Sequence, residues 1–600
     1  MAEIKIQIKA GRKSAFLQTA RGRLLSEVLA EAGYPLRLYC QGRGVCGQCF
    51  VRIIKGQLPE ESQSEKELRL NKRLSPDYRL ACQLRIASPL TISLPESLLI
   101  KEEISSWLKP SQEERAIRSD FNPLIKKYSL NLSGLSFISQ ARLKAAIRLK
   151  LGLLKLDFKS AALRKLAEMS GKNRLVTAVV YDDKLLLDFE PGDTLSKTFG
   201  LAVDLGTTTV SAQLIDLFTG QTLASKATAN LQTRFGSDLI SRISLAINNS
   251  ANLKKLQETG LKSIELLISA LAKEAWVKRQ WIYAMTLAGN PVMNHLFLGL
   301  PVESFGHSPF QPAFISHPPV SAFELGLQIN SQAMVYLCPN LASFVGGDIS
   351  SGLLYTKLVK KKGNYLYVDL GTNGEIILKK GRTILATSTA AGPAFEGSGI
   401  SCGLQAVPGA IEKVNWQNGR FVFKTIGQTS PAGLCGSGLI AALAEALKAG
   451  LLAPSGKILK GKSGIRVARK IVITQEDVRK LQLAMAAIKS GLKLLLKASG
   501  LKWSELDGLY LAGVFGNSID LNQCCFLGLL PPLPQNKIFF AGNASLAGAR
   551  LVLLSQKARR EIDKLPGQIT FFSLASQKDF QSEFLKALAI GTNYWRESDV

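Results

Sequence analysis

The chain has 600 residues, 46% hydrophobic and 20% charged, and its 75 Lys and Arg against 46 Asp and Glu give a formal charge of +29. This composition excludes a disordered chain, and the length predicts three or more folded units because single domains rarely exceed about 250–300 residues. The basic excess is spread along the chain without a basic arm or zinc finger, so we expect no nucleic-acid binding and favour an acidic protein partner.

The N-terminal sequence MAEIKIQIKAGRK alternates Ile with charged residues, as a strand does and a signal peptide does not. No run of about 18 apolar residues is free of charge, so we expect a cytoplasmic protein with no membrane contact. Nine cysteines in such a chain favour metal binding or catalysis over disulfides.

Residues 1–97 predict a compact α+β domain with period-2 strands around Ile6 and Ile92, and a short amphipathic helix before Gly33. The segment 39-YCQGRGVCGQC-49 then places three cysteines in a glycine-rich loop with the spacing Cys-x5-Cys-x2-Cys. A single further cysteine lies 33 residues downstream of this loop. The four candidate ligands are Cys40, Cys46, Cys49 and Cys82.

Four thiolates are what a 2Fe-2S cluster requires, and glycine allows the backbone to wrap closely around it. A zinc ribbon is the alternative, but zinc sites favour two Cys-x2-Cys pairs. The domain resembles plant- and adrenodoxin-type ferredoxins with a β-grasp fold, and this resemblance implies a 2Fe-2S cluster held by the four cysteines.

Residues 98–125 are charged, contain Pro110 and Pro123, and are predicted to be a linker. Residues 126–198 predict a small α/β connecting domain, with a Leu/Lys-rich helix over 137–156 and strands at 175–181 and 184–190. From residue 199 to 600, strands and helices alternate, which indicates layered α/β architecture.

This last part repeats one motif about 165 residues apart, in 201-LAVDLGTTTVSAQLID-216 and 366-LYVDLGTNGEIIL-378. Each copy is an apolar strand that ends in an aspartate, Asp204 or Asp369, and a polar turn. A carboxylate there is suited to hold Mg²⁺, and turn N–H and hydroxyl groups are suited to cradle phosphate. The candidate phosphate contacts are Gly206, Thr207, Thr208, Gly371, Thr372, Asn373 and Gly374.

Further glycine-bearing turns occur at 345-VGGDIS-350, 433-GLCGSG-438, 511-LAGVFGNSIDL-521 and 541-AGNASLAGAR-550. Purely structural turns are the alternative. Together the motifs resemble the actin, sugar-kinase and heat-shock-chaperone ATPase superfamily, which implies two duplicated lobes closing over ATP. The resemblance adds Gly346, Gly347 and Asp348 to the candidate nucleotide site, and Gly513 and Gly516 as contacts near adenosine.

Three patterns are interpreted as unrelated to function. Gly456–Ser463 matches G-x4-GK[ST] but lacks the preceding apolar strand that a P-loop needs. The adjacent Cys524 and Cys525 are candidates for a second cluster only as a minor alternative. The three histidines have no ligand spacing and no nucleophile partner.

A ferredoxin module, a connecting domain and an actin-like ATPase in one chain resemble the ATP-dependent reductive activators of corrinoid proteins. Supporting stretches include 230-NLQTRFGSDLISRI-243, 289-GNPVMNHL-296 and 391-AGPAFEGSGI-400. The resemblance implies that the cluster reduces Co(II) to Co(I) on a corrinoid partner of a methyl-transfer system, supplied by an upstream low-potential donor. It leaves open whether the chain acts as a homodimer. The alternatives are a dehydratase-type activator and a ferredoxin-like carrier that binds nucleotide without hydrolysis.

Overall fold

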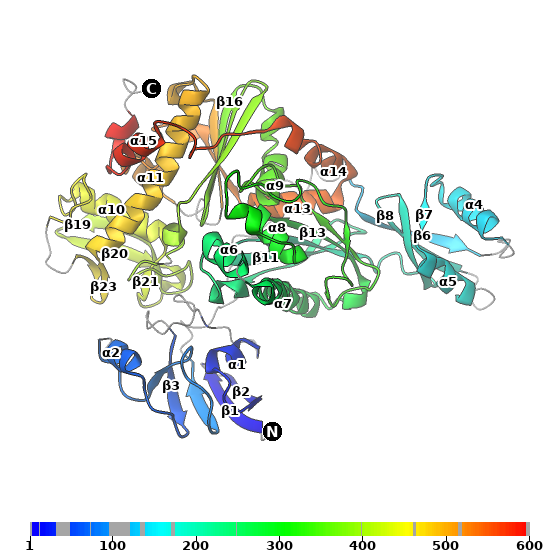
Figure 1. Ribbon diagram of the computed structural model, residues 1–600, viewed down its shortest axis with the longest axis horizontal. Helices are drawn as coiled ribbons and strands as arrows, with labels where there is room; N and C mark the ends of the chain where they lie inside the picture. The colour runs from blue at the N-terminus through cyan, green and yellow to red at the C-terminus, as the bar shows by residue number, and fades with distance from the viewer. Residues whose placement is uncertain are drawn as a thin grey trace.

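The computed structural model describes residues 3–10, 13–31, 36, 49–71, 74–94, 120–132, 139–169, 175–247, 249–397, 399–459, 464–513 and 519–595. These residues form a small N-terminal domain, a second small domain and two large lobes (Figure 1). The predicted multidomain fold is thus confirmed.

The N-terminal domain is a five-stranded sheet in the order β2-β1-β5-β3-β4, in which β1 and β5 are parallel. Its elements are β1 (Glu3–Ala10), β2 (Lys13–Ala20), α1 (Leu25–Glu31), β3 (Phe50–Lys55), α2 (Gln63–Asn71), β4 (Tyr78–Leu80) and β5 (Leu90–Ser93). Alternate residues of β1, including Ile6 and Ile8, face α1 and are fully buried with Leu25 and Leu29. The order and the packing helix are those of the β-grasp fold.

The second domain is a four-stranded sheet in the order β6-β8-β9-β7 that carries two helices. Its elements are β6 (Ile125–Asn131), α4 (Gln140–Leu151), β7 (Asp157–Phe158), α5 (Ser160–Met169), β8 (Leu175–Tyr181) and β9 (Leu185–Pro191). Helix α4 is shorter than the predicted 137–156. It ends because Gly152 takes a φ of 69° and donates its N–H to the last-turn carbonyls of Arg148 and Leu149.

The first lobe is built on a six-stranded sheet, β12-β11-β10-β13-β15-β14. Its elements are β10 (Phe199–Leu205), β11 (Thr209–Asp216), β12 (Thr222–Ala229), η2 (Leu231–Arg234), α6 (Leu239–Ile247), α7 (Ser250–Glu274), η3 (Arg279–Trp281), β13 (Ile282–Gly289), α8 (Pro291–Leu298), η4 (Glu303–Phe305), β14 (Val320–Ser321), β15 (Met334–Leu337), α9 (Gly347–Thr356) and η5 (Leu358–Lys360).

The second lobe has a matching sheet, β25-β24-β16-β17-β18-β26, with smaller β-ribbons beside it. Its elements are β16 (Asn364–Leu370), β17 (Gly374–Lys380), β18 (Thr383–Thr389), η6 (Pro393–Glu396), β19 (Ala410–Gln417), β20 (Arg420–Thr425), η7 (Ile426–Gln428), β21 (Gly433–Leu434), α10 (Gly436–Lys448), β22 (Ile465–Ala468), β23 (Ile471–Ile473), α11 (Gln475–Ala498), η8 (Trp503–Glu505), β24 (Gly508–Ala512), α12 (Leu521–Phe526), η10 (Gln535–Lys537), β25 (Ile538–Gly542), α13 (Ala544–Leu554), α14 (Gln556–Ile562), η11 (Leu565–Gln568), β26 (Thr570–Phe571), α15 (Phe580–Ala587) and η12 (Thr592–Trp595).

The two lobes repeat one topology, as the paired motifs predicted. In each lobe a three-stranded antiparallel meander is followed by a strand that pairs in parallel with the first strand, β13 with β10 and β24 with β16. Asp204 and Asp369 occupy the same place, one residue before the end of β10 and β16. Both carboxylates therefore reach the edge of their sheet that faces the other lobe.

Helix α13 crosses from the second lobe back onto the first. It packs against α9 at a close approach, where a Cβ on Gly548 would lie 2.1 Å from the carbonyl oxygen of Ser351. Leu546, Ala549 and Val552 are buried in the same core as residues of β13 and α9. Helix α13 thus completes the wall of the first lobe.

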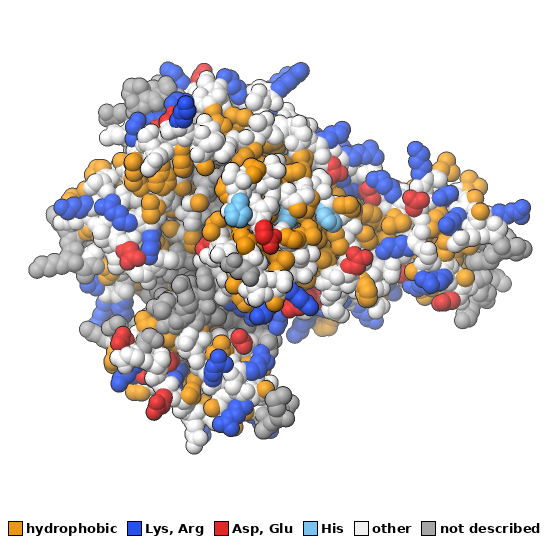
Figure 2. Space-filling model, in the orientation of Figure 1, with side chains coloured by type: hydrophobic (Ala, Val, Ile, Leu, Met, Phe, Trp, Pro, Cys, Tyr) orange, Lys and Arg blue, Asp and Glu red, His pale blue; other side chains and the backbone are white. Residues whose placement is uncertain are grey.

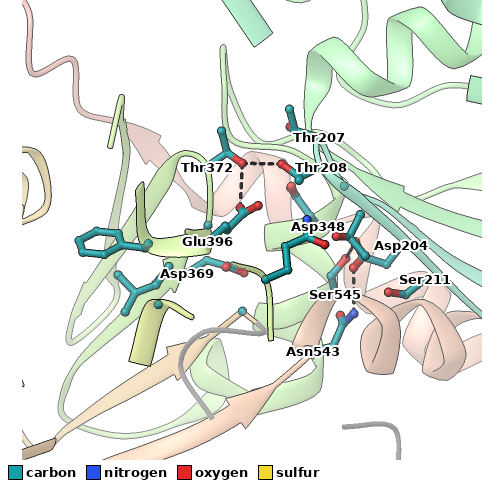
Figure 3. A pocket seen from close by; sticks show the side chains of 18 of the residues that line it. Asp204, Thr207, Thr208, Ser211, Asp348, Asp369, Thr372, Glu396, Asn543 and Ser545 are labelled. Carbon is teal, nitrogen blue, oxygen red and sulfur yellow. Dashed lines mark hydrogen bonds between the residues drawn. The ribbon is translucent and has the colours of Figure 1, made fainter. Parts of the chain in front are cut away.

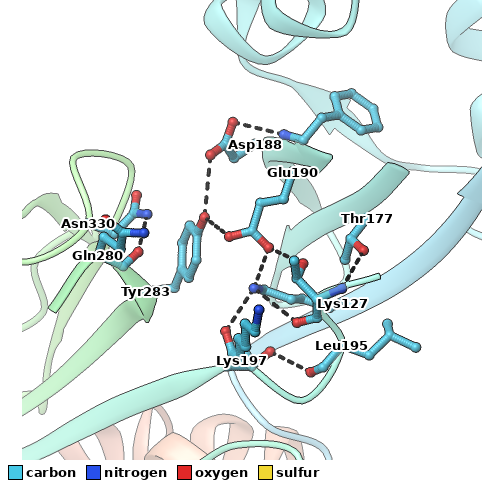
Figure 4. A network of polar contacts seen from close by, with 12 residues as sticks. Lys127, Thr177, Asp188, Glu190, Leu195, Lys197, Gln280, Tyr283 and Asn330 are labelled. Carbon is cyan, nitrogen blue, oxygen red and sulfur yellow. Dashed lines mark hydrogen bonds and ion pairs between the residues drawn. The ribbon is translucent and has the colours of Figure 1, made fainter. Parts of the chain in front are cut away.

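A buried polar network joins the second domain to the first lobe (Figure 4). The hydroxyl of Tyr283, on β13, donates to Glu190 (2.7 Å) and lies 3.3 Å from Asp188, both on β9. Lys127 on β6 pairs with Glu190 and lies over the Tyr283 ring, while Lys165 on α5 pairs with Asp188. Both ion pairs lie within the second domain and hold the two acids in place. The Tyr283 side chain therefore makes the link to the first lobe.

Residues 120–125 were expected to belong to the linker, but they pack on the first lobe. The N–H groups of Asn122 and Leu124 donate to the carbonyls of Leu554 and Leu553 at 2.9 and 2.8 Å. Leu124 and Ile125 are buried in the core that includes α13. Residues 120–125 are therefore part of the folded core next to α13.

Lys and Arg side chains are scattered over every part of the face in Figure 2 without a single basic patch, which agrees with the even spread of charge along the sequence. Among the described helices, none combines the length and apolar character needed to cross a bilayer.

Candidate functional site

Two of the four predicted cluster ligands lie side by side in the N-terminal domain. The register of β3 and β4 opposes Phe50 and Leu80, and the N–H of Ala81 donates to the carbonyl of Cys49 at 3.0 Å. Cys49 and Cys82, which flank this pair, are both buried. The strand pairing thus brings the single downstream cysteine to the end of the cysteine loop. Cys40 and Cys46 lie outside the described residues.

A cleft between the two lobes collects most of the predicted nucleotide residues (Figure 3). From the predicted set, its lining includes Asp204, Gly206, Thr207, Thr208, Asp348, Asp369, Gly371, Thr372, Asn373 and Gly513. The lining also includes carboxylates that the sequence analysis did not single out, Glu375 and Glu396. Sequence positions from 204 to 545 therefore converge on one site.

Asp204 is held in place by residues from the start of α13. Asn543 Nδ2 donates to one carboxylate oxygen at 2.9 Å, and Ser545 Oγ donates to the other at 2.8 Å (Figure 3). Burial raises the pKa of Asp204, and these two hydrogen bonds oppose the rise. Asn543 and Ser545 thus fix the orientation of the first aspartate.

The second loop carries the more strongly perturbed group. Burial, reinforced by the nearby charges of Asp348, Asp204 and Glu396, raises the pKa of Asp369 to about 8. Burial likewise raises the pKa of Asp348 and of Glu375. Several buried carboxylates thus share one site, where each raises the pKa of its neighbours.

The residues present fit Mg²⁺. Among the described lining residues, five are carboxylic acids and none is Lys, Arg or His. An oxygen-only set of this kind suits a hard divalent cation, whereas zinc and iron prefer nitrogen or sulfur ligands. Nothing else in the described lining neutralises the acids.

A hydrogen-bonded chain connects the two loops across the cleft (Figure 3). Thr372 Oγ1 donates to Glu396 Oε1 at 2.8 Å, and the Thr208 and Thr372 hydroxyl oxygens lie 3.0 Å apart. Burial raises the pKa of Glu396, and Thr372 opposes this rise. The two polar turns therefore meet across the cleft through their threonine hydroxyls.

Three predicted glycines are not among the lining residues, and their contact with nucleotide stays a prediction. A Cβ on Gly346 would lie 2.5 Å from Asn290 Cα, one on Gly347 2.5 Å from the carbonyl oxygen of Cys338, and one on Gly374 2.0 Å from Ile488 Cδ1. These glycines permit close packing of the wall.

Gly513 does line the cleft, with a φ of +88°, and a Cβ there would lie 2.8 Å from an Asp369 carboxylate oxygen. This position is beside the second aspartate. Gly516 lies outside the described residues.

The patterns set aside in the sequence stay outside the cleft. Cys524 and Cys525 lie on α12, where burial raises the pKa of both thiols and so disfavours the thiolate that a metal needs. No metal-binding group of three or more His, Cys, Asp or Glu occurs among the described residues. His295 accepts the N–H of Ala313 at Nε2 (3.0 Å) and stacks on Phe314, as a packed histidine does.

Comparison with known proteins agrees with this architecture. A model of a 2Fe-2S iron-sulfur cluster binding domain matches residues 9–87, a model of the RACo middle region matches residues 199–361, and a model of the C-terminal ASKHA domain of RACo matches residues 363–598.

Two relatives and one solved structure show the extent of the similarity. The corrinoid activation enzyme RamQ of Eubacterium limosum is 32% identical over 96% of this chain and 98% of its own length. The [Co(II) methylated amine-specific corrinoid protein] reductase of Methanosarcina barkeri is 27% identical over 66% of this chain and 77% of its own. A reductive activator for corrinoid, iron-sulfur protein aligns over 99% of this chain and 100% of its own at 34% identity and a TM-score of 0.74.

Proposed function

Because this chain belongs to the family of reductive activators of corrinoid proteins, we propose that it uses ATP to drive one electron from a 2Fe-2S cluster to the Co(II) of a corrinoid protein, forming Co(I). The observation that carries the proposal is the presence, in one chain, of a 2Fe-2S-type domain and a two-lobed cleft crowded with carboxylates. The partner would belong to a methyl-transfer system, and an upstream low-potential donor would reload the cluster.

Asp204 and Asp369 would organise Mg²⁺ and water, with Asn543 and Ser545 fixing the first carboxylate. Phosphate oxygens would be held by the turn that begins at Gly206 and by the turn that begins at Gly371. The phosphate-contact set comprises Thr207, Thr208, Thr372 and Asn373, with Gly374 supporting the second turn from behind.

The adenosine end of the cleft would lie where its lining becomes apolar. Phe395, Ala406 and Val407 line this part of the cleft together with Gly436 and Ser437 at the start of α10. Gly513, beside Asp369, and Gly516, which follows it in sequence, would contact adenosine from the other side. This assignment leaves the charged half of the cleft for the phosphates.

Cys40, Cys46, Cys49 and Cys82 would hold the cluster, which supplies one low-potential electron when bound. Plant-type clusters lie near about −400 mV. If the Co(II)/Co(I) couple lies about 0.2 V lower, transfer costs roughly 5 kcal/mol, since 59 mV is a factor of ten for one electron. ATP can offset this cost only by binding the electron-transfer complex more tightly than the separated proteins.

We further propose a ferredoxin-type domain over residues 1–97, a linker that ends before residue 120, a second domain that extends to residue 198 and an ATPase domain over residues 199–600. We also propose a cytoplasmic location and an acidic docking surface on the partner. The homodimeric state is left to measurement.

The test is an anaerobic assay in which a corrinoid protein in the Co(II) state is mixed with this protein, a chemical reductant, Mg²⁺ and ATP. The expected result is the visible absorption of Co(I), absent without ATP. Asp204→Ala is expected to abolish ATP turnover and cobalt reduction while leaving the iron-sulfur absorption intact. Loss of the iron-sulfur absorption together with ATP turnover would contradict the separation of the nucleotide site from the cluster site.

The two alternatives make different predictions. A dehydratase-type activator usually holds a 4Fe-4S cluster between subunits, so an EPR signal of one 2Fe-2S centre per chain would contradict it. A carrier that binds nucleotide without hydrolysis would release no phosphate when the corrinoid protein is added.

A further inference from the structure

The first polar turn, residues 205–209, is held from behind by one buried segment, residues 230–242. Three consecutive carbonyls of the turn accept hydrogen bonds from it. Asn230 Nδ2 donates to Gly206 O at 2.8 Å, Arg242 donates to Thr207 O at 2.5 Å, and the backbone N–H of Asn230 donates to Thr208 O at 2.8 Å. The turn therefore has a fixed back and a front that faces the cleft.

The side chains that form this support bond to one another. Gln232 Oε1 accepts from Asn230 Nδ2 at 3.3 Å and from Arg242 Nη1 at 3.1 Å. Asn230, Gln232 and Arg242 are each 0% exposed. We call these three residues the support network. A buried polar network rigidifies its surroundings only when each of its polar groups has a hydrogen-bond partner. The side-chain groups of these three residues meet this condition.

A glycine in the long helix α7 makes room for the support network. A Cβ on Gly260 would lie 2.9 Å from Gln232 Nε2, and Gln232 Nε2 donates to Leu256 O at 2.8 Å. Glycine in a helix interior costs about 1 kcal/mol relative to alanine. The presence of glycine here indicates that the hydrogen bonds made by Gln232 in this position offset the cost in helix stability.

The geometry of the peptide bond converts this support into an orientation of donors. In a planar trans peptide the C=O of one residue and the N–H of the next point in opposite directions. Arg242 draws the carbonyl of Thr207 into the interior, so the N–H of Thr208 points the other way, toward the cleft that Thr208 lines. The bond from Asn230 to Gly206 O turns the N–H of Thr207 in the same manner.

Arg242 also brings a charge that the surrounding protein leaves largely uncompensated. Its three oxygen acceptors, on Gly236, Gln232 and Thr207, are all neutral. The nearest acid, Asp238, accepts instead from the N–H and the hydroxyl of Ser241. Burial lowers the pKa of Arg242 to about 9, and Asp238 opposes this only in part. A buried cation without an ion-pair partner is costly unless a ligand supplies the anion.

We propose that the support network is a phosphate-positioning device, in which Arg242 aims the N–H of Thr208 at a nucleotide phosphate and contributes a buried positive charge behind the turn. This deepens the proposed function and rests on it. Because the cleft itself is lined by five carboxylates, a positive charge behind the turn lowers the repulsion that a polyphosphate meets there. Arg242 is a positioning residue and does not reach the ligand itself.

The test compares adenosine, ADP and ATP as ligands of the full-length, anaerobically purified protein in the presence of Mg²⁺. Arg242→Met removes the charge and the donors at similar length. The affinity of this variant for ADP and ATP is expected to fall about ten- to hundredfold, because the Thr208 N–H is no longer aimed at the charged phosphate. Its affinity for adenosine, which has no phosphate, should change less than about twofold. Equal losses for all three ligands, or no loss, would overturn the proposal.

Arg242→Lys keeps the charge but loses the planar fork, so its ratio of ADP to adenosine affinity is expected to fall between those of wild type and Arg242→Met. If Arg242→Met does not fold, the Lys variant decides, and an unchanged ratio would refute the proposal. Arg559→Met is the matched control, since Arg559 is also buried but pairs with Asp182 at 2.7 Å. It is expected to lower the melting temperature without changing the ratio.

The outcomes separate this inference from the function it rests on. A wild-type protein that binds none of the three ligands would contradict the proposed function. A wild-type protein that binds nucleotides, with Arg242 variants that keep its ADP-to-adenosine ratio, would contradict only the role of the support network.

Discussion

Asp369 should make the binding of Mg²⁺ and nucleotide depend on pH. Its carboxyl has a pKa of about 8 in the ligand-free cleft, so only about one tenth of it is ionised at pH 7 and about nine tenths at pH 9. A cation binds the ionised form and must displace the proton. The affinity for Mg²⁺ with ADP is therefore expected to rise at least about tenfold from pH 7 to pH 9. At pH 7 Asp369 should release roughly one proton per Mg²⁺ bound, in addition to any protons released by the other buried carboxyls of the cleft.

Isothermal titration in buffers of different ionisation enthalpy measures both the affinity and the number of protons released. Asp369→Asn is the matched variant because it keeps the shape of the side chain but has no proton to displace. It should bind Mg²⁺ more weakly at pH 9 and show a smaller pH slope than wild type, because only the other buried carboxyls of the cleft remain to titrate. Wild-type affinity that is flat between pH 7 and pH 9, or the same slope in the variant, would refute the reasoning.

Three further changes test other parts of the structure. Gly513→Ala forces a Cβ to 2.7 Å from Leu370 O at a φ of +88°, so nucleotide affinity should fall at least about tenfold. Gly381→Ala is the control, because Gly381 has a φ of +57° and open space around it. This control should lose only the backbone strain of about 1–2 kcal/mol in stability and leave nucleotide affinity unchanged. Tyr283→Phe leaves Glu190 without its 2.7 Å donor, so urea denaturation should show about 1–3 kcal/mol less stability, and an unchanged midpoint would contradict the role of this contact. Cys82→Ser should lose the visible absorption of the cluster, while Cys525→Ser should keep full iron content; loss of iron in both would point to a second cluster site.

The pKa of Asp369 also sets a direction for stability. A carboxyl whose pKa is raised on folding stabilises the native state below its unfolded pKa of about 4, and this contribution is lost as pH rises through about 8. The ligand-free protein should therefore melt at a lower temperature at pH 9 than at pH 6. Asp369→Asn should show a smaller decline, and Mg²⁺ with ADP should reduce the decline in wild type.

Local pattern was sufficient for much of the fold. Period-2 alternation identified β1 and β5, and two apolar strands ending in aspartate identified the duplicated lobes. The hydrophobic pattern was less informative about where an element ends, because a single residue can set the end. Helix α4 ends at Gly152 because only glycine readily takes the left-handed conformation there, although the apolar pattern continues to residue 156.

The nucleotide cleft was predictable only in part. Glu375 had a usable signal, since a tight hairpin after Asp369 places it directly across the strand pair. Glu396 had no comparable signal, because it reaches the cleft from a 3-10 turn that follows β18 and is not paired with the aspartate strand. Gly374 was assigned to a phosphate contact from its turn motif, and Gly346 and Gly347 to the nucleotide site from the superfamily resemblance, although glycine is equally required where two segments of backbone pack closely.

What the sequence determined by itself is the local chemistry: which cysteines are spaced for a cluster and which strands end in an aspartate and a polar turn, because these depend on residues close together in the chain. What only the tertiary structure decided is which distant groups meet them. Asn543 and Ser545 reach Asp204 from 339 and 341 residues away because α13 packs back onto the first lobe, and Arg242 reaches Thr207 because residues 230–242 fold behind the turn. Such contacts follow from the burial of apolar helix faces against a common sheet, which no local pattern specifies.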